Sequence, residues 1–199
     1  MVKQRIIEEA SELFGRSGVK SITMDDLARH LGISKRTIYE NFKDKEELLI
    51  ACIDVFHDEQ RTHYEKVFLN ADNVANAILV LLQSSFKQTS QRQFKMMYDI
   101  RKYYPQVFKE RLTRFHVDKQ MGMEQMIQRG INEGVFRNDL KPGIIAYFFC
   151  GDILHVDKDL ERFSLMDYFE NVVITFLRGI CTTKGIDIID QYKIKMSKP

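Results

Sequence analysis

Residues 24–48 carry the feature that most constrains the fold: a short apolar stretch, a glycine, and a second short stretch rich in cationic and hydroxyl side chains. The small side chain of Ala28 lets two helices approach closely, and Gly32 can take a left-handed turn between them at little steric cost. We expect the aliphatic side chain of Ile38 to close the small core. This spacing predicts a helix-turn-helix, a unit that places its second helix in the DNA major groove.

Capping residues set the expected bounds of these two helices. Thr23 followed by Asp26 resembles a capping box for a helix over about 24–31. Ser34 is a suitable N-cap for the second helix, which we expect over about 35–42.

The chain is expected to form two domains. A first helix over about 2–17 completes a three-helix DNA-binding domain over residues 1–48. Asp44 is the expected cap of a long bridging helix from about 44 to 69, which leads into a second helical domain over residues 49–199.

The second domain is predicted to contain only helices, because long stretches lack glycine, proline and alternating β-branched runs. We expect helices at about 74–86, 91–103, 105–134 with a weak point at Gly122, 142–158 and 164–182. Gly185, in the lysine-rich tail from Lys184, favours irregular structure there. The predicted fold class is all-α.

Composition excludes several classes of protein. The net charge of +2 is small, yet Lys35, Arg36, Lys43 and Lys45 cluster locally, and DNA binding needs a positive face rather than a positive protein. The three cysteines form no CxxC pair, which argues against a disulfide framework or a zinc site and suits a reducing compartment. No hydrolase, metalloprotease or dinucleotide motif occurs, so we expect neither an enzyme nor a cofactor.

The apolar runs are too short to span a bilayer, the longest lying near 144–150 and 172–177. Acidic residues interrupt the segment after Met1, so no leader peptide is expected. We expect a cytoplasmic bacterial protein, associated with the nucleoid through DNA binding.

The segment from about Ile6 to Phe56 resembles the N-terminal signature of TetR-family transcriptional regulators. The matching residues are Thr23, Leu27, Ala28, Leu31, Gly32, Ile33, Ser34, Thr37, Ile38, Tyr39, Phe42, Lys45, Glu46 and Leu48. The resemblance implies a homodimer that binds a palindromic operator and is released from it by a small molecule.

Candidate DNA-binding residues lie on or beside the second helix of the motif. They are Ser21, Thr23, Ser34, Lys35, Arg36, Thr37, Tyr39 and Lys45. We expect Arg36 to bind the O6 and N7 atoms of a guanine and Lys45 to bind a phosphate. The alternative for each residue is a solvated side chain that caps a helix or aids solubility.

The resemblance also implies an effector pocket in the second domain. The candidate residues are Met96, Met97, Tyr98, Tyr104, Phe108, Phe115, Met123 and Met126, with Asp152 and His155 as polar groups that would orient a partly apolar ligand. Methionine and aromatic side chains line adaptable pockets, but they also fill ordinary cores, so both interpretations stay open.

A homodimer interface is expected on the last two long helices, where the resemblance implies a four-helix arrangement. The candidate residues are Ile144, Tyr147, Phe148, Leu154, Phe169, Val173, Phe176 and Leu177. Nearly continuous apolar residues over 144–148 favour a helix buried on two sides. The alternative is that these residues pack within one subunit.

Together these features predict a sequence-specific regulator of transcription, most simply a repressor released by a small-molecule effector. One alternative is an architectural or partner-regulated DNA-binding protein of the same fold. Another is a helical ligand-binding or enzymatic protein that does not bind DNA. The residues that argue against the second alternative are the intact Lys35, Arg36, Tyr39 and Lys45.

Overall fold

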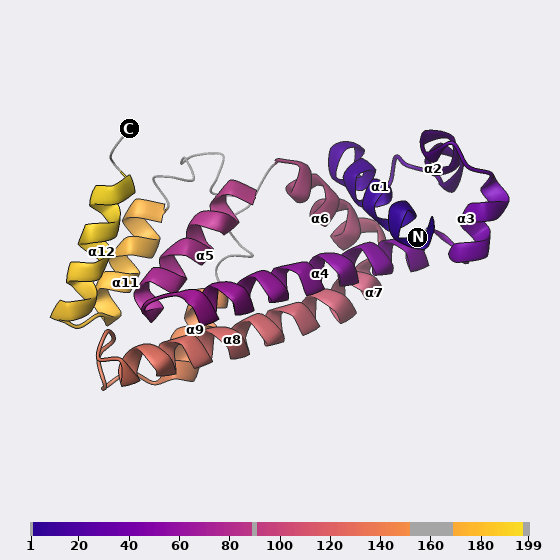
Figure 1. Ribbon diagram of the computed structural model, residues 1–199. Coiled ribbons are helices and arrows are strands. Elements are labelled where there is room, and N and C mark those ends of the chain that lie inside the picture. Colours follow the sequence, from indigo (N-terminus) through magenta and orange to yellow (C-terminus); the bar gives the residue numbers. More distant parts are fainter. Residues whose placement is uncertain (1, 89–90, 152–168, 197–199) are drawn as a thin grey trace. The chain divides into compact units, whose positions relative to one another are not determined.

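The computed structural model describes residues 2–88, 91–151 and 169–196, which are almost entirely helical (Figure 1). The helices are α1 (Val2–Ser17), α2 (Met24–Leu31), α3 (Lys35–Asn41), α4 (Lys45–Asn70), α5 (Val74–Gln88), α6 (Gln91–Tyr103), α7 (Pro105–Val107), the π-helix η1 (Phe108–Leu112), α8 (Thr113–Asn132), α9 (Pro142–Gly151), the π-helix η4 (Phe169–Val173), α11 (Ile174–Ile180) and α12 (Thr183–Met196). Within the described ranges, β-structure is confined to one isolated bridge between Phe136 and Cys181. The predicted all-α class is therefore confirmed.

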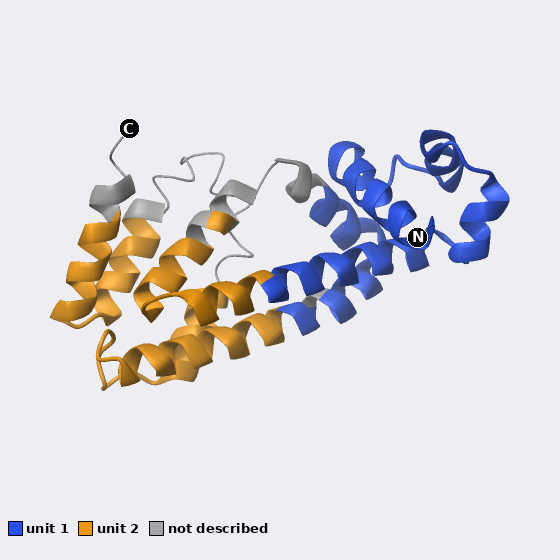
Figure 2. Ribbon diagram, in the orientation of Figure 1, with its two compact units in different colours: residues 1–62, 89–115 blue, residues 63–88, 116–199 orange. Residues whose placement is uncertain are grey.

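The chain divides into two compact units (Figure 2). Unit 1 comprises residues 1–62 and 89–115, and unit 2 comprises residues 63–88 and 116–199. Packing thus joins α6 and α7 to the N-terminal helices, although residues 63–88 of the other unit lie between them in sequence. The predicted boundary at residue 48 divides a DNA-binding domain from a domain for dimerisation and effector binding. This division by function stays a prediction.

The core of unit 1 holds the helix-turn-helix together. Phe14 of α1, Leu27 of α2 and Ile38 of α3 are fully buried in one apolar cluster. Helices α6 and α7 contribute Ile100 and Val107 to the same cluster. The helix-turn-helix therefore shares its core with residues from the middle of the chain.

The core of unit 2 gathers side chains from α5, α8, α11 and α12. Ile78, Ile127, Leu177 and Ile189 are buried in one cluster. Phe136, from the connection between α8 and α9, fills the same cluster. Each of these helices buries one apolar side, and together they form one common hydrophobic core.

Residues 184–196 are helical, so the prediction of irregular structure at Gly185 was wrong, while residues 197–199 lie outside the described part of the chain. Ile186, Ile189 and Tyr192 are spaced by three residues and lie on one side of α12, against the core of unit 2. A Cβ at Gly185 would lie 2.3 Å from the carbonyl oxygen of Val135. The glycine therefore permits close packing of α12 instead of ending it.

The predicted weak point at Gly122 was also wrong, since α8 continues through this residue. One exposed glycine reduces the stability of a helix by about 1 kcal/mol, which a helix of this length tolerates. The irregularity lies earlier, where η1 forms a π turn over Phe108–Leu112. Its wider hydrogen-bonding pattern places Arg111 3.1 Å from both carboxylate oxygens of Asp54 on α4.

No helix in the part of the chain that the structure describes combines the length and the apolar character needed to cross a membrane. The same residues contain no group of three or more His, Cys, Asp or Glu side chains that could hold a metal ion. Burial raises the pKa of the Cys52 thiol to about 11 and that of Cys181 to about 11, so both are neutral thiols at physiological pH.

Two glycines of α8 provide a matched test of this packing. A Cβ at Gly130 would lie 2.2 Å from the ring of Phe136 and 2.6 Å from Cγ1 of Val74, whereas a Cβ at Gly122 would meet nothing within 4 Å. We expect Gly130→Ala to destabilise the protein by about 1–3 kcal/mol through overpacking. The control Gly122→Ala should stabilise it by about 0.5–1 kcal/mol through helix propensity. Denaturant unfolding followed by circular dichroism measures both, and equal effects of the two variants would contradict the packing of unit 2.

Candidate nucleic-acid interface

The turn between α2 and α3 has the geometry that the sequence predicted. Gly32 adopts φ 65° and ψ 31°, and its N–H points to the carbonyl oxygens of Ala28 and Arg29. The N–H of Ile33 donates to the carbonyl of Ala28 at 3.0 Å. These bonds satisfy carbonyls at the end of α2, and the left-handed residue turns the chain directly into α3.

The start of α3 is fixed by Ser34. Its Oγ accepts the N–H of Thr37 at 3.0 Å and lies 2.8 Å from Oγ1 of the same residue. Ile38 is buried on the inner side of the helix and Phe42 is buried directly after its last residue, whereas Lys35, Arg36 and Tyr39 are exposed. The outer side of α3 thus presents two cations and a phenol to solvent.

The exposed cations of α3 are paired with neighbouring acids. The amino group of Lys35 binds the carboxylate of Asp25 on α2. Nε of Arg36 donates to Oε1 of Glu40 at 2.8 Å, and the Arg36 side chain is 88% exposed. Exposed ion pairs of this kind contribute only about 0–1 kcal/mol, so a phosphate or a base can replace the acid at small cost.

Lys45 is less exposed than a free surface lysine. Its amino nitrogen lies 5.9 Å from the centroid of the Phe14 ring. Partial burial lowers the pKa of Lys45, while the negative charges of Asp99 and Asp26 act in the opposite direction. The core therefore restrains this cation, and its role as a phosphate ligand stays a prediction.

The hydroxyls of Ser21 and Thr23 are engaged within the protein. Ser21 donates to the carbonyl of Ser17 at 2.6 Å. Oγ1 of Thr23 accepts the N–H of Asp26 at 3.1 Å, and Oδ2 of Asp26 accepts the N–H of Thr23 at 3.0 Å. This confirms the capping box, and the hydrogen bonds from Thr23 lower the pKa of Asp26. Both hydroxyls order the start of α2, and their contact with phosphate stays a prediction.

The predicted effector residues are distributed over both units. Met96, Met97, Tyr104 and Phe108 pack against the core of unit 1, where Phe115 makes an edge contact with His57, and Tyr98 is exposed. Met126 is buried in the core of unit 2, and Met123 is partly buried against it. Asp152 and His155 lie outside the described residues. Neither unit alone gathers the predicted set around one cavity.

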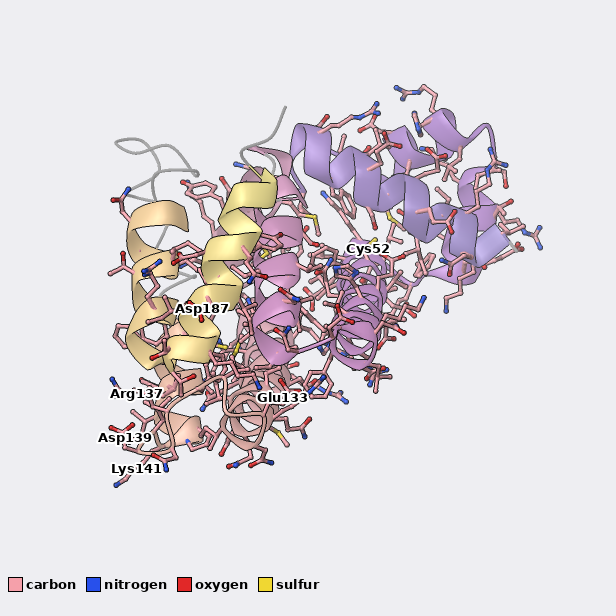
Figure 3. The ribbon with its side chains drawn as sticks, turned by 60° about the vertical axis from the view of Figure 1, so that its left-hand side comes forward. Cys52, Glu133, Arg137, Asp139, Lys141 and Asp187 are labelled. Carbon is pink, nitrogen blue, oxygen red and sulfur yellow. The ribbon has the colours of Figure 1, made fainter. Side chains whose placement is uncertain are left out.

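A depression of about 690 Å³ in unit 2 is lined by a different set, namely Ile131, Gly134, Phe136, Arg137, Asn138, Asp139 and Thr182. Figure 3 labels Arg137 and Asp139 in this region. Arg137 donates to Oδ1 of Asp139 at 3.1 Å and to the carbonyl of Gly179 at 2.9 Å. The guanidinium of Arg137, the cation among the lining residues, is therefore already bonded to groups of the protein.

The predicted dimer residues fall into two groups. Ile144, Tyr147 and Phe148 on α9 are 62%, 66% and 57% exposed. Val173 and Leu177 are instead buried in the core of unit 2 and have little area left to bury against a second copy, so their place on an interface stays a prediction. Phe176 is half-buried, and its ring stacks on Phe148 with centroids 5.4 Å apart. Leu154 and the Phe169 side chain lie outside what the structure describes.

Sequence reasoning missed two features, a contact between residues distant in the chain and a buried polar atom without a partner in the described part of the chain. The N–H of Lys20 donates to Oδ2 of Asp99 at 2.9 Å, although 79 positions separate them. Nε2 of His63 is buried and has no hydrogen-bond partner within the described residues. No local spacing relates Lys20 to Asp99, and only the packing of α6 in unit 1 reveals the contact.

Comparison with known proteins agrees with the geometry of the site. Residues 6–52 match the family model described as bacterial regulatory proteins, tetR family. An HTH-type transcriptional regulator of Staphylococcus aureus strain USA300 is 40% identical over 65 residues, which cover 33% of this chain. The aligned segment spans about a third of that relative, 35% of its length.

Solved structures extend the likeness over most of the chain. A TetR-family regulator of Agrobacterium tumefaciens has a TM-score of 0.74 at 14% identity, covering 90% of this chain and 97% of that one. A second, from Cytophaga hutchinsonii, has a TM-score of 0.74 at 18% identity, covering 92% and 96%. The ketosteroid transcriptional regulator KstR2 of Mycobacterium tuberculosis has a TM-score of 0.62 at 20% identity, covering 92% and 96%.

At these identities the solved structures establish the fold, while the matched segment contains the turn at Gly32, the cap at Ser34 and the buried Ile38 described above. Residues 6–52 therefore match the DNA-binding segment of the tetR family of bacterial regulatory proteins, and the chain as a whole shares the fold of solved TetR-family regulators.

Proposed function

We propose that the protein is a sequence-specific DNA-binding regulator of transcription, and that it acts as a repressor by occupying promoter DNA. The outer side of α3 carries this proposal. Its inner side is buried through Ile38, its start is fixed by Ser34, and its outer side presents Arg36 and Tyr39. A rigid helix with exposed cations and hydrogen-bonding groups fits the major groove, where base edges differ in their donors and acceptors.

Specific recognition by α3 requires that the acids around it be displaced. Glu40 holds Arg36 and Asp25 holds Lys35 in the free protein. Both pairs are exposed and weak, so the phosphate charge of DNA competes with them effectively. The arrangement supports a mechanism in which Asp25 and Glu40 neutralise Lys35 and Arg36 in the free protein. DNA then replaces these acids as the partner of each cation.

The proposal includes a homodimer that binds a palindromic operator. One helix-turn-helix contacts only a few base pairs, and two of them on one dimer gain both site length and avidity. Ile144, Tyr147 and Phe148 on α9 give the second copy an exposed apolar surface to cover. Apolar side chains concentrated on one helix in this way mark an interaction surface.

The proposed regulator responds to a small, partly apolar effector that favours a conformation unable to bind the operator. The mycobacterial protein with the same fold is named a ketosteroid regulator, which supports an apolar class of ligand for this fold. Met123 and Met126 in unit 2 provide polarizable side chains of the kind that adapt to such a ligand.

DNA binding is tested by selection of the purified protein against random duplex DNA at two salt concentrations. We expect enrichment of a palindrome, with an affinity that falls steeply as salt rises, because phosphate contacts release counterions. Enrichment of no sequence would contradict the proposed function. Broad binding without sequence preference would favour an architectural protein instead.

Two substitutions separate base recognition from phosphate binding. We expect Arg36→Ala to relax the preference at one base position by about 1–3 kcal/mol, because a bidentate contact to guanine is lost. Lys45→Ala should weaken binding to all sequences alike, since phosphate contacts carry no sequence information. A binding selection repeated with each variant measures both, with thermal unfolding as the control for folding. An unchanged base preference for Arg36→Ala would refute its assigned role.

The dimer is tested by light scattering at micromolar concentration. The double variant Tyr147→Glu/Phe148→Glu should be monomeric, because each buried carboxylate would be desolvated without a partner. The control Leu69→Glu changes a strongly exposed apolar residue on α4 and should leave the dimer intact. A wild-type monomer would refute the proposed homodimer, and a double variant that still dimerises would place the interface elsewhere.

A further inference from the structure

The loop that joins α1 to α2 is held in one conformation from several sides. Gly18 adopts φ 83°, in the left-handed region, and the next residue, Val19, is fully buried. Ser21 is tied back to the carbonyl of Ser17. Two positions after Ser21, Thr23 begins the capping box of α2. The conformation of this loop therefore sets where α2 starts.

Helix α6 holds Lys20, the central residue of this loop, at two points. The Lys20 N–H donates to Oδ2 of Asp99 at 2.9 Å, and its amino group donates to the Tyr103 hydroxyl at 3.3 Å. The amino nitrogen also lies 4.6 Å from the centroid of the Tyr103 ring. The hydrogen bond from Lys20 lowers the pKa of Tyr103. All three residues belong to unit 1.

Asp99 differs from the other acids of unit 1 in its burial. It is 9% exposed, and among the residues that the structure describes it is the charged side chain classed with the core. A buried carboxylate is retained only where hydrogen bonds or charges compensate its desolvation. Here the backbone N–H of Lys20 supplies a hydrogen bond, and the Asp99 charge also favours the charged form of Lys45.

We propose that Asp99 is a positioning residue for DNA recognition: its carboxylate fixes the Lys20 N–H, and through it the start of α2, without contacting DNA. The proposal rests on the proposed DNA-binding function. A buried acid is unsuited to contact phosphate, so Asp99 acts through the groups that it holds, and the Lys20 N–H is the one bonded to it directly. Helix α2 supplies Asp25, the partner of Lys35, and ends at the turn into α3. A displaced α2 therefore misplaces the recognition helix.

The test compares Asp99→Ala with Asp99→Asn in operator-binding titrations of the full-length protein. Alanine removes the acceptor, whereas the asparagine side chain keeps an oxygen that can accept the Lys20 N–H. We expect affinity to fall about tenfold for Asp99→Ala, because the N–H loses a charged acceptor. Asp99→Asn should stay within about threefold of the wild type, since a neutral acceptor retains much of the bond.

The control variant is Asp54→Ala. It removes another carboxylate of unit 1, one whose partner is Arg111 on η1 rather than a residue of the loop. We expect its operator affinity to stay within about threefold of the wild type, because exposed or half-exposed pairs contribute little. A loss as large as that of Asp99→Ala would show that any missing acid in unit 1 disturbs binding, and it would overturn the proposal.

Amide hydrogen exchange provides a measurement that does not depend on any variant folding. In the wild-type protein the Lys20 amide should exchange slowly, and rapid exchange would overturn the proposal directly. If Asp99→Ala binds as tightly as the wild type, or if Asp99→Asn is as weak as Asp99→Ala, the hydrogen bond does not position α2. A wild-type protein that selects no operator would instead refute the proposed function, whatever the state of the Lys20 amide.

Discussion

Burial of the inner sides of α2 and α3 against α1 is the interaction on which the recognition surface depends. Phe14, Leu27 and Ile38 form one apolar cluster, and the fully buried Ile38 leaves α3 only one orientation in which its polar side faces solvent. Burying a side chain of this size contributes about 1.5–3 kcal/mol. A helix as short as α3 has little stability of its own, so packing and the Ser34 cap together maintain it.

Charge has a different role from burial in this surface. The net charge of the chain is only +2, and the cations of α3 are neutralised locally by Asp25 and Glu40. Attraction to DNA therefore depends on exchange of partners rather than on a large uncompensated field. Such exchange favours DNA over weaker anions, because a duplex presents many phosphates along the path of one helix.

Local sequence was sufficient to predict α1 to α4 and the turn at Gly32, because caps, glycine and apolar spacing act within a few residues. It failed for α12, because Gly185 was expected to favour irregular structure. The glycine instead allows the helix to pack closely against the backbone of Val135. It left the partner of Val173 and Leu177 open, because an apolar stripe does not reveal whether its partner is the same subunit or a second copy. The contact between Lys20 and Asp99 could not be predicted, since it exists only once α6 packs in unit 1.

The sharing of one core between N-terminal and central helices has a consequence for how regulators of this kind can diverge. Ile100 and Val107 complete the cluster that supports α3, yet they lie far along the chain from it. A recombination breakpoint between residues 63 and 89 would replace Ile100 and Val107 by residues of another protein. The core that supports α3 would then contain side chains that did not evolve with it. New operator preferences should therefore arise by substitutions on the outer side of α3 more readily than by exchange of N-terminal gene segments.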